Sequence, residues 1–496
     1  MDNPNNPTEN ENITKKRELS ILEALIPVFA LIIMLGFNVL VVYGDLALDG
    51  SNQFILLLGG AVAAIVGYFN KVKFDTMIDE VAKNIQSTAG AILILLMVGA
   101  LAGTWLISGI IPTMIYYGLQ ILNPTIFLAA TVVICSVISV ATGSSWTTSA
   151  TVGIALIGIA DALGIPLGMT AGAILSGAYF GDKMSPLSDT TNLAPAMAGT
   201  DLFTHIKYMA ITTVPTIIVT ILAFIIIGLN LETTGSTDTS SILNAINHSF
   251  NISPWLFLIP AIVIFLIVRK TSPLIALLIG TLLGAIAAII AQPEIVLSIS
   301  GAEKLNFVNA YRGIMDSITI GASINTESEA LNDLFSSSGM QGMLGTIWLI
   351  ICAMVFGGIM DAIGALARIS KALLNLFQTV FGLFASTVFS CLALNFTASD
   401  QYLAIVVPGK MFAKAYRDKG LAPENLSRTL EDSGTVTSVL IPWNTCGAYH
   451  SGVLGVPVAS YAIYCFFNYL SPFMTLLFAA FRIKIRELST NEVETA

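Results

Sequence analysis

The sequence predicts an all-α, polytopic membrane protein made of two inverted-topology repeats with broken or re-entrant helices. Three observations lead to this fold class. The 496 residues are 55% hydrophobic and only 11% charged, whereas a soluble domain carries about 25% charged residues. Apolar runs of membrane-spanning length recur along the chain. Two sets of these runs carry the same Gly, Ser, Thr and Asp signals in the same order.

The first apolar run sets the orientation of the chain. It extends from Leu25 to Val42 without a charge, which is long enough to cross a hydrocarbon core of about 30 Å as a helix. It is too long for a signal-peptide core, and no cleavage site of small residues follows it. Residues 15–17 are all cationic, and the loop after the run carries only acidic charges. Because positive charge stays inside, we expect a cytoplasmic N-terminus.

The other apolar segments form two sets separated by a polar stretch, Glu232 to Ser253. Several are shorter than the ~20 residues of a simple span, and the short ones cluster around 142–200 and 395–450. Cationic loops and the C-terminus are predicted to be cytoplasmic. The first set lies near 21–44, 52–69, 88–108, 125–141, 146–160, 167–180 and 206–229, and the second near 254–268, 273–291, 344–360, 373–394, 399–412, 435–448 and 454–481.

These boundaries predict five parts. They are a cytoplasmic N-terminal tail (1–20), a first transmembrane half (21–230), a polar linker (231–253), a second transmembrane half (254–485) and a cytoplasmic C-terminal tail (486–496). Residues 292–343 are Ser/Gly-rich and lie between an outward and an inward span, so we interpret them as an external loop with partial helix or a re-entrant piece.

The two halves match at a nearly constant offset. Gly109 and Gly364 each end a span, and Thr142 and Thr397 lie at the same offset of 255 residues, as do Ser144 and Ser399. Further on, residues 180–194 align with 430–448, which places Asp182 opposite Asp432 and Asn192 opposite Asn444.

Charge distribution gives matching segments opposite directions. Residues 88–108 should run outward and residues 344–360 inward. Inverted repeats of this kind are typical of secondary transporters, in which discontinuous helices form a site near the bilayer midplane.

The stretch GDKMSPLSDTTN (181–192) has the composition of such a break. Pro186 removes a backbone donor and disfavours helix at Ser185, and freed carbonyls join hydroxyl, amide and carboxylate oxygens. Hard cations prefer oxygen ligands, and a membrane-embedded carboxylate also takes a proton. We therefore predict a cation/proton site made of Asp182, Ser185, Asp189, Thr190, Thr191, Asn192, Thr142, Ser144, Ser145, Thr397, Asp400, Asp432 and Asn444. Lys183 and Glu431 are predicted modulators of this site.

Plainer interpretations stand beside these assignments. Asp189, or else Ser188 or Thr190, would cap the helix that follows, and Asp201 would cap the next one. The hydroxyls of residues 142–149 would bond back to their own helix.

The two modulators have plainer interpretations as well. Lys183 would be an interfacial residue or a partner of Asp182. Glu431 would be a solvated loop charge beside Arg428.

Several classes of function are disfavoured. The sequence has no phosphate loop, no GxSxG elbow and no HExxH motif, and its five cysteines form no CxxC pair. We therefore expect neither an enzyme nor a cofactor. Few arginines lie in the predicted spans, although a tightly held dicarboxylate usually wants one. This observation counts against the hypothesis of an organic-anion substrate but does not exclude it.

At this point the sequence resembles a known family. GAYFGDKMSPLSDTTNLAPAMAGTDLFTHI (177–206), together with the region around 430–450 and the order of segments, is similar to the NhaC family of bacterial Na⁺/H⁺ antiporters. The resemblance spans roughly 20–485. It implies Na⁺/H⁺ exchange across a bacterial inner membrane, with Na⁺ at Asp182 and Asp189. It also implies the scaffold and transport domains of the ion-transporter superfamily.

Three hypotheses follow. The first is a Na⁺/H⁺ antiporter in which the two ions compete for buried carboxylates. The second is a Na⁺/H⁺-coupled organic-acid exchanger of the malate/lactate type, a branch that the resemblance includes. The third is a channel or an intramembrane hydrolase. A channel does not require two inverted breaks with carboxylates, and a hydrolase would need a catalytic motif that the sequence lacks. The expected partners are Na⁺, H⁺ and the lipid bilayer, with no nucleic acid. The oligomeric state is left open, with a homodimer as one arrangement.

Overall fold

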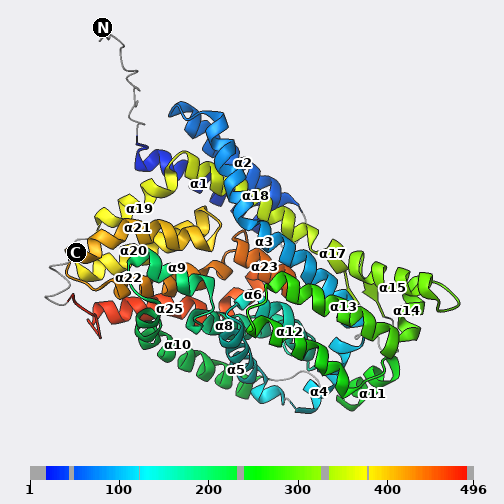
Figure 1. Cartoon of the computed structure of the whole chain (residues 1–496). Coiled ribbons are helices and arrows are strands. Elements are labelled where there is room, and N and C mark those ends of the chain that lie inside the picture. The colour runs from blue at the N-terminus through cyan, green and yellow to red at the C-terminus, as the bar shows by residue number, and fades with distance from the viewer. Residues whose placement is uncertain are drawn as a thin grey trace, which may run out of the picture.

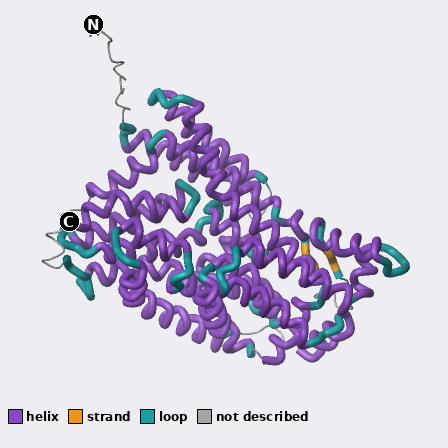
Figure 2. Tube along the Cα trace, viewed as in Figure 1, coloured by secondary structure: helices purple, strands orange, loops and turns teal. Residues whose placement is uncertain are grey.

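A computed structural model describes residues 18–43, 50–121, 123–231, 239–324, 335–376 and 379–488. This part of the chain is nearly all helical (Figure 2), as the composition predicts. One small antiparallel sheet pairs β1 (Ala322–Ser323) with β2 (Ser336–Ser337). Residues 1–17 of the expected N-terminal tail and 489–496 of the expected C-terminal tail lie outside the described residues. The molecule is elongated, with α19–α22 and α25 at one end and α14 and α15 at the other (Figure 1).

Eight helices of the described chain are long and apolar enough to cross a membrane, or up to ten if each of two bent pairs counts as one span. The bent pairs are Ile242–Ser249 with Pro254–Val268, at 87°, and Val458–Tyr464 with Phe466–Ala480, at 50°. The chain is therefore a polytopic membrane protein.

The elements of the first half follow the predicted segments closely, except that the span predicted at 88–108 is the end of a longer helix. They are α1 (Ile21–Phe37), η1 (Asn38–Tyr43), α2 (Ser51–Phe69), α3 (Phe74–Ile107), α4 (Ile110–Ile121), α5 (Pro124–Thr142), α6 (Ser145–Thr148), η3 (Ser149–Gly153), α7 (Ile154–Ala162), α8 (Leu167–Met184), α9 (Asp189–Ala198) and α10 (Leu202–Asn230). The polar linker contains α11 (Thr239–Ser249).

The second half begins with η4 (Pro254–Phe257), α12 (Leu258–Val268) and α13 (Pro273–Ala291). The described residues of 292–343, which exclude 325–334, then form α14 (Pro293–Ser300), α15 (Phe307–Thr319), the small sheet and α17 (Gly339–Gly342), so they contain the partial helix that we expect there.

The rest of this half repeats the first. It comprises α18 (Leu344–Ala362), α19 (Ala365–Leu376), α20 (Val380–Thr397), α21 (Gln401–Asp418), α22 (Pro423–Leu430), η5 (Glu431–Thr435), η6 (Ser438–Leu440), α23 (Thr445–Leu454), α24 (Val458–Tyr461), η7 (Ala462–Tyr464) and α25 (Phe466–Ala480).

Glycines at matching turns show that this order is a duplication. Gly109 after α3 and Gly364 after α18 share a φ of +78°, in the left-handed region that favours glycine. Gly164 before α8 and Gly420 before α22 have φ of +67° and +69°. Gly199 and Gly455, which follow α9 and α23, also have positive φ. Each half therefore runs long helix, short helix, span, break, helix, turn, broken helix, short helix and final span.

Matching helices α3 and α18 pack against each other in opposite directions. A Cβ on Gly358, late in α18, would collide with the backbone of Val81, early in α3. Late in α3, a Cβ on Gly99 would collide with Gly339, just before α18. The repeat is therefore inverted, as the charge distribution predicts.

The halves exchange packing partners around this central pair. Helix α2 packs on α18, and its counterpart α13 packs on α3. Within the first half, α5 packs on α8, and between the halves the final helices α10 and α25 pack on each other. The contacts therefore bind the two halves into one unit.

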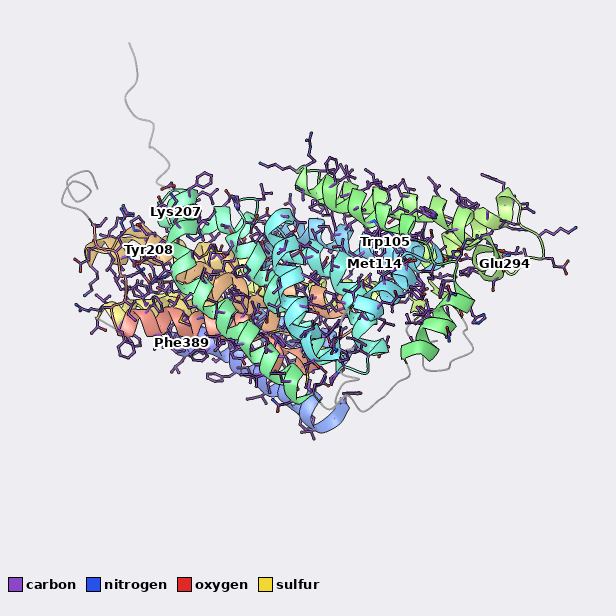
Figure 3. The ribbon with its side chains drawn as sticks, turned by 90° about the horizontal axis from the view of Figure 1, so that it is seen from below. Trp105, Met114, Lys207, Tyr208, Glu294 and Phe389 are labelled. Carbon is purple, nitrogen blue, oxygen red and sulfur yellow. The ribbon has the colours of Figure 1, made fainter. Side chains whose placement is uncertain are left out.

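Helix α10 illustrates how the membrane sorts side chains. It exposes apolar residues such as Ile218, Leu222 and Ile226. Its buried face carries threonines, of which Thr216 and Thr220 donate to backbone carbonyls one turn earlier, both at 2.8 Å. Because lipid offers no hydrogen-bond partners, such hydroxyls are satisfied inside the helix. Figure 3 shows Lys207 and Tyr208 near the start of α10, far from Glu294 at the other end of the molecule.

Candidate functional site

The first break of the first half lies between α5 and α6. Gly143 adopts φ of +70° after α5, and a Cβ there would stand 2.6 Å from the Leu187 side chain. Ser144 is extended and caps α6, with its Oγ accepting from the Thr147 N–H at 3.2 Å. Both the conformation and the close approach require glycine at this position.

The second break lies between α8 and α9 and touches the first at Leu187. Helix α8 ends at Met184, Ser185 is extended, and Ser188 caps α9 by accepting from the Thr191 N–H at 3.4 Å. The Thr191 hydroxyl donates to the Asp182 and Lys183 carbonyls at 3.2 and 3.1 Å. Pro186 therefore produces the predicted interruption, and the cap is Ser188 rather than Asp189.

Asp182 joins the two breaks. One of its carboxylate oxygens, Oδ2, accepts from Ser145 Oγ at 2.6 Å and from the Ser145 N–H at 3.0 Å. Ser145 is the first residue of α6, so the carboxylate lies at a helix N-terminus, where negative charge is stabilised. Although Asp182 is only 8% exposed, it reaches the wall of a cavity.

The cavity has a volume of about 680 Å³. Asp182, Asp189, Lys270, Gln401 and Tyr402 are among its lining residues. Asp189 is exposed and accepts from the Tyr402 hydroxyl at 3.2 Å. The lining comes from α3, both breaks, the α12–α13 turn and the start of α21. The wall therefore combines two carboxylates, one ammonium and several hydroxyls.

The structure brings the first-half candidates together. Thr142, Ser144, Asp182, Asp189, Thr190 and Asn192 line the cavity. Ser145, Ser185 and Thr191 are buried behind them. Several hydroxyls in 142–149 bond back to their own helix, as Thr148 does to the Ser144 carbonyl at 2.9 Å, whereas the Ser145 hydroxyl is directed to Asp182.

The second-half candidates Thr397, Asp400, Asp432 and Asn444 are absent from the residues that line this cavity. Asp400 caps α21, accepting from the Leu403 N–H at 2.9 Å. Asn444 caps α23 and donates to the Asn395 carbonyl at 3.0 Å. Asn444 thus occupies the position of Ser188 rather than that of Asn192, because each residue begins the helix after its break. Thr397 donates to a carbonyl of its own helix at 2.7 Å.

Lys183 has a different partner from the one the sequence suggests. Its ammonium pairs with the carboxylate of Asp432 across the two halves, and neither side chain is exposed. Asp432 also accepts from the hydroxyl of Thr212 on α10, at 2.8 Å, and from that of Thr475 on α25. Both predicted alternatives for Lys183, an interfacial residue and a partner of Asp182, are therefore wrong.

Two further charges of the second half are buried rather than solvated. Glu431 is fully buried, and neither carboxylate oxygen has a hydrogen-bond partner in the described chain. Arg428 is also fully buried, with its guanidinium 4.6 Å from the centre of the Tyr208 ring. The interpretation of Glu431 as a solvated loop charge is therefore wrong, and at least one arginine is buried in the interior of the folded protein.

Sequence reasoning missed Gln401, Tyr402 and Lys270 as cavity residues. The first two directly follow the predicted site residue Asp400 in the sequence, so they could have been included. Lys270 was used only as one of the cationic residues that predict a cytoplasmic loop. The described residues contain no group of three or more His, Cys, Asp or Glu side chains that could hold a metal ion. The cavity instead offers a few carboxylates and many neutral oxygens, a donor set for a hard monovalent cation.

An inverted pair of broken-helix repeats around a polar cavity defines a secondary transporter rather than an enzyme. Residues 177–483 match the Na⁺/H⁺ antiporter family, and residues 3–229 match the C4-dicarboxylate anaerobic carrier family.

Individual relatives cover most of the chain. The Na⁺/H⁺ antiporter NhaC of Alkalihalophilus pseudofirmus is 35% identical over 451 residues, which are 89% of this chain and 95% of that protein. The NhaC of Bacillus subtilis is 35% identical over 399 residues, or 80% and 85%. The malate-2H⁺/Na⁺-lactate antiporter of Bacillus subtilis is 35% identical over 460 residues, or 92% and 93%. This chain belongs to the Na⁺/H⁺ antiporter family of the NhaC type.

Proposed function

We propose that this protein exchanges Na⁺ for H⁺ across a bacterial inner membrane. The observation that carries the proposal is Asp182, a carboxylate held by Ser145 at the junction of two helix breaks and reached from the cavity. A carboxylate in this position accepts either a hard cation or a proton. The relatives named as NhaC Na⁺/H⁺ antiporters support the same exchange.

The mechanism follows from this competition. When Asp182 is ionised, it and the exposed carboxylate of Asp189 attract Na⁺, and the hydroxyl and carbonyl oxygens of both breaks replace part of its water shell. When Asp182 is protonated, the attraction is lost and Na⁺ leaves. If each form is admitted from one side of the membrane at a time, Na⁺ and H⁺ move in opposite directions.

The same proposal sets the orientation. The cationic residues before α1, and those in the α12–α13 turn and after α25, support a cytoplasmic location of both termini by the positive-inside rule. In this proposal Na⁺ and H⁺ are the transported ions, and the exchange requires no cofactor.

Neutralising the carboxylate tests the proposal. Asp182→Asn should reduce Na⁺-driven proton movement in everted vesicles to the background of vesicles that lack the protein, and Asp189→Asn should do the same. Asp201→Asn is the matched control, since Asp201 caps α10 outside the cavity. Full exchange by both cavity variants at normal expression would overturn the assignment.

A second candidate is a Na⁺/H⁺-coupled organic-acid exchanger. Two features favour it: the volume of about 680 Å³ falls within the range of small-molecule sites, and Lys270 contributes an ammonium group to the wall. The relative that exchanges malate for lactate supports it as well. Reconstituted protein under a pH gradient should be offered Na⁺, malate and lactate separately. Exchange with Na⁺ alone supports simple antiport, whereas a requirement for an organic acid supports the exchanger.

A further inference from the structure

Asp432 lies in the second-repeat helix, from α22 through η5 to η6, that corresponds to α8 in the first repeat. The sequence alignment of Asp432 with Asp182 is wrong, because Asp182 lies near the end of α8 whereas Asp432 lies near the middle of a helical run that continues to Leu440. Each is buried, and each accepts a hydroxyl hydrogen bond from another element. Matching helices of the two repeats therefore each carry a buried carboxylate, at different positions along the helix.

Their cationic surroundings differ. Asp182 contacts no ammonium or guanidinium group among the described ion pairs and lines the cavity. The Asp432 carboxylate forms an ion pair with the Lys183 ammonium. It also accepts hydrogen bonds from the hydroxyls of Thr212, at 2.8 Å, and Thr475. The ammonium also lies 5.7 Å from the centre of the Phe467 ring, a distance at which an aromatic face attracts a cation. We call Asp432, Thr212 and Thr475 the Asp432 cage.

The cage has the composition of an alkali-cation site. It provides one carboxylate and two hydroxyl oxygens from three separate helical elements, and such hard oxygens suit Na⁺ or Li⁺. A lysine ammonium is a compact point charge, so it can take the place of a monovalent ion. The Lys183 side chain extends from α8 and is not exposed to solvent.

We propose that the Asp432 cage is a second cation site and that the Lys183 ammonium is its permanent occupant. If the first-repeat site binds Na⁺, as the proposed function requires, each chain then has one exchangeable cation site although its fold contains two. Replacing Lys183 with a short uncharged side chain should open the cage to a free alkali cation.

Binding of radiolabelled Na⁺ to the purified full-length protein at alkaline pH tests this inference. Wild type should bind one Na⁺ per chain and Asp182→Asn none. The double variant Asp182→Asn/Lys183→Ser should regain one Na⁺, and adding Asp432→Asn should abolish it. Failure of the double variant to bind Na⁺ or Li⁺ overturns the proposal.

Loss of the buried ion pair also destabilises the protein, which provides a second measurement. The melting temperature of the double variant should rise in NaCl relative to choline chloride, and this salt effect should vanish when Asp432→Asn is added. Instability that NaCl does not correct contradicts the inference. If wild type moves no protons in response to Na⁺ while the double variant still binds Na⁺, the proposed function fails and the cage proposal holds. If wild type moves protons in response to Na⁺ while the double variant binds no Na⁺, only the cage proposal fails.

Discussion

At the scale of single residues, the interaction between Ser145 and Asp182 determines the position of the Asp182 carboxylate in the cavity wall. The carboxylate receives two hydrogen bonds from one residue, through Oγ at 2.6 Å and through the backbone N–H at 3.0 Å. Hydrogen bonds to charged groups contribute about 1.5–3 kcal/mol each. This contact therefore fixes where the carboxylate lies relative to the oxygens of both breaks.

Removing the hydroxyl should weaken cation binding and leave the fold intact. Ser145→Ala keeps the backbone donor, so we expect the KM for Na⁺ to rise roughly tenfold, in line with the loss of one charged hydrogen bond. Ser149→Ala is the control, because the Ser149 hydroxyl donates to a carbonyl of its own helix at 3.1 Å. An unchanged KM in Ser145→Ala would show that the hydroxyl does not position Asp182.

At the scale of elements, the contact between α5 and α8 depends on glycine. A Cβ on Gly181 would lie 2.5 Å from the Ser136 carbonyl oxygen and 2.6 Å from the Val140 backbone nitrogen. Helix α8 carries Asp182 and α5 leads into the first break, so their separation fixes the geometry of the site.

Gly181→Ala should therefore lower the free energy of unfolding by about 1–3 kcal/mol or more, the usual cost of overpacking. Gly36→Ala in α1 is the control, since a Cβ there meets nothing within 4 Å and alanine favours a helix by about 1 kcal/mol. Denaturant unfolding in detergent measures both changes. Equal stability of the two variants would contradict the packing argument.

The start of α10 should respond to acid. Hydrogen bonds from Thr204 to the exposed carboxylate lower the pKa of Asp201 below its usual value of 3.8. A lowered pKa in the folded state gives stability above the unfolded value, and this stability is lost as the pH falls through the folded value. Asp201→Asn should remove this part of the acid sensitivity, so its melting temperature should fall less than that of wild type below about pH 4. Parallel pH profiles would rule out this role.

At the scale of the whole molecule, the inverted repeat fixes which loops share a side of the membrane. Helix α13 crosses between Arg269, in the α12–α13 turn, and Glu303, after α14. Both residues are exposed. All five native cysteines are buried. Thiol labelling of introduced, exposed cysteines should therefore exceed the labelling of the native ones.

Membrane-impermeant thiol reagents should therefore label Arg269→Cys from the cytoplasmic side and Glu303→Cys from the external side. Lys83→Cys on the exposed face of α3 should match Arg269→Cys. Labelling of Arg269→Cys and Glu303→Cys from the same side in intact cells would contradict the predicted topology.

Local signals made much of this structure predictable. Gly143 and Pro186 interrupt helices through their own backbone properties, so both first-half breaks could be placed from the sequence. The segment predicted at 435–448 was less clear, because its apolar composition conceals the turn between η6 and α23.

Long-range partners were not predictable in this way. Lys183 and Asp432 are 249 residues apart, and nothing beside either residue specifies the other. The burial of Glu431 and Arg428 also depends on tertiary packing, since the surrounding charges resemble a solvated helix face. The sequence therefore locates the candidate carboxylates and leaves their pairing to the fold.

The exchanged packing of α2 on α18 and of α13 on α3 has an evolutionary consequence. Helices α3 and α18 are covered partly by the opposite half, although other contacts, such as α5 on α8, lie within one half. A half-length chain alone would leave these faces of its central helix uncovered, and a second copy in the opposite orientation would cover them. Gene fusion of such an antiparallel pair would give the single polypeptide seen here.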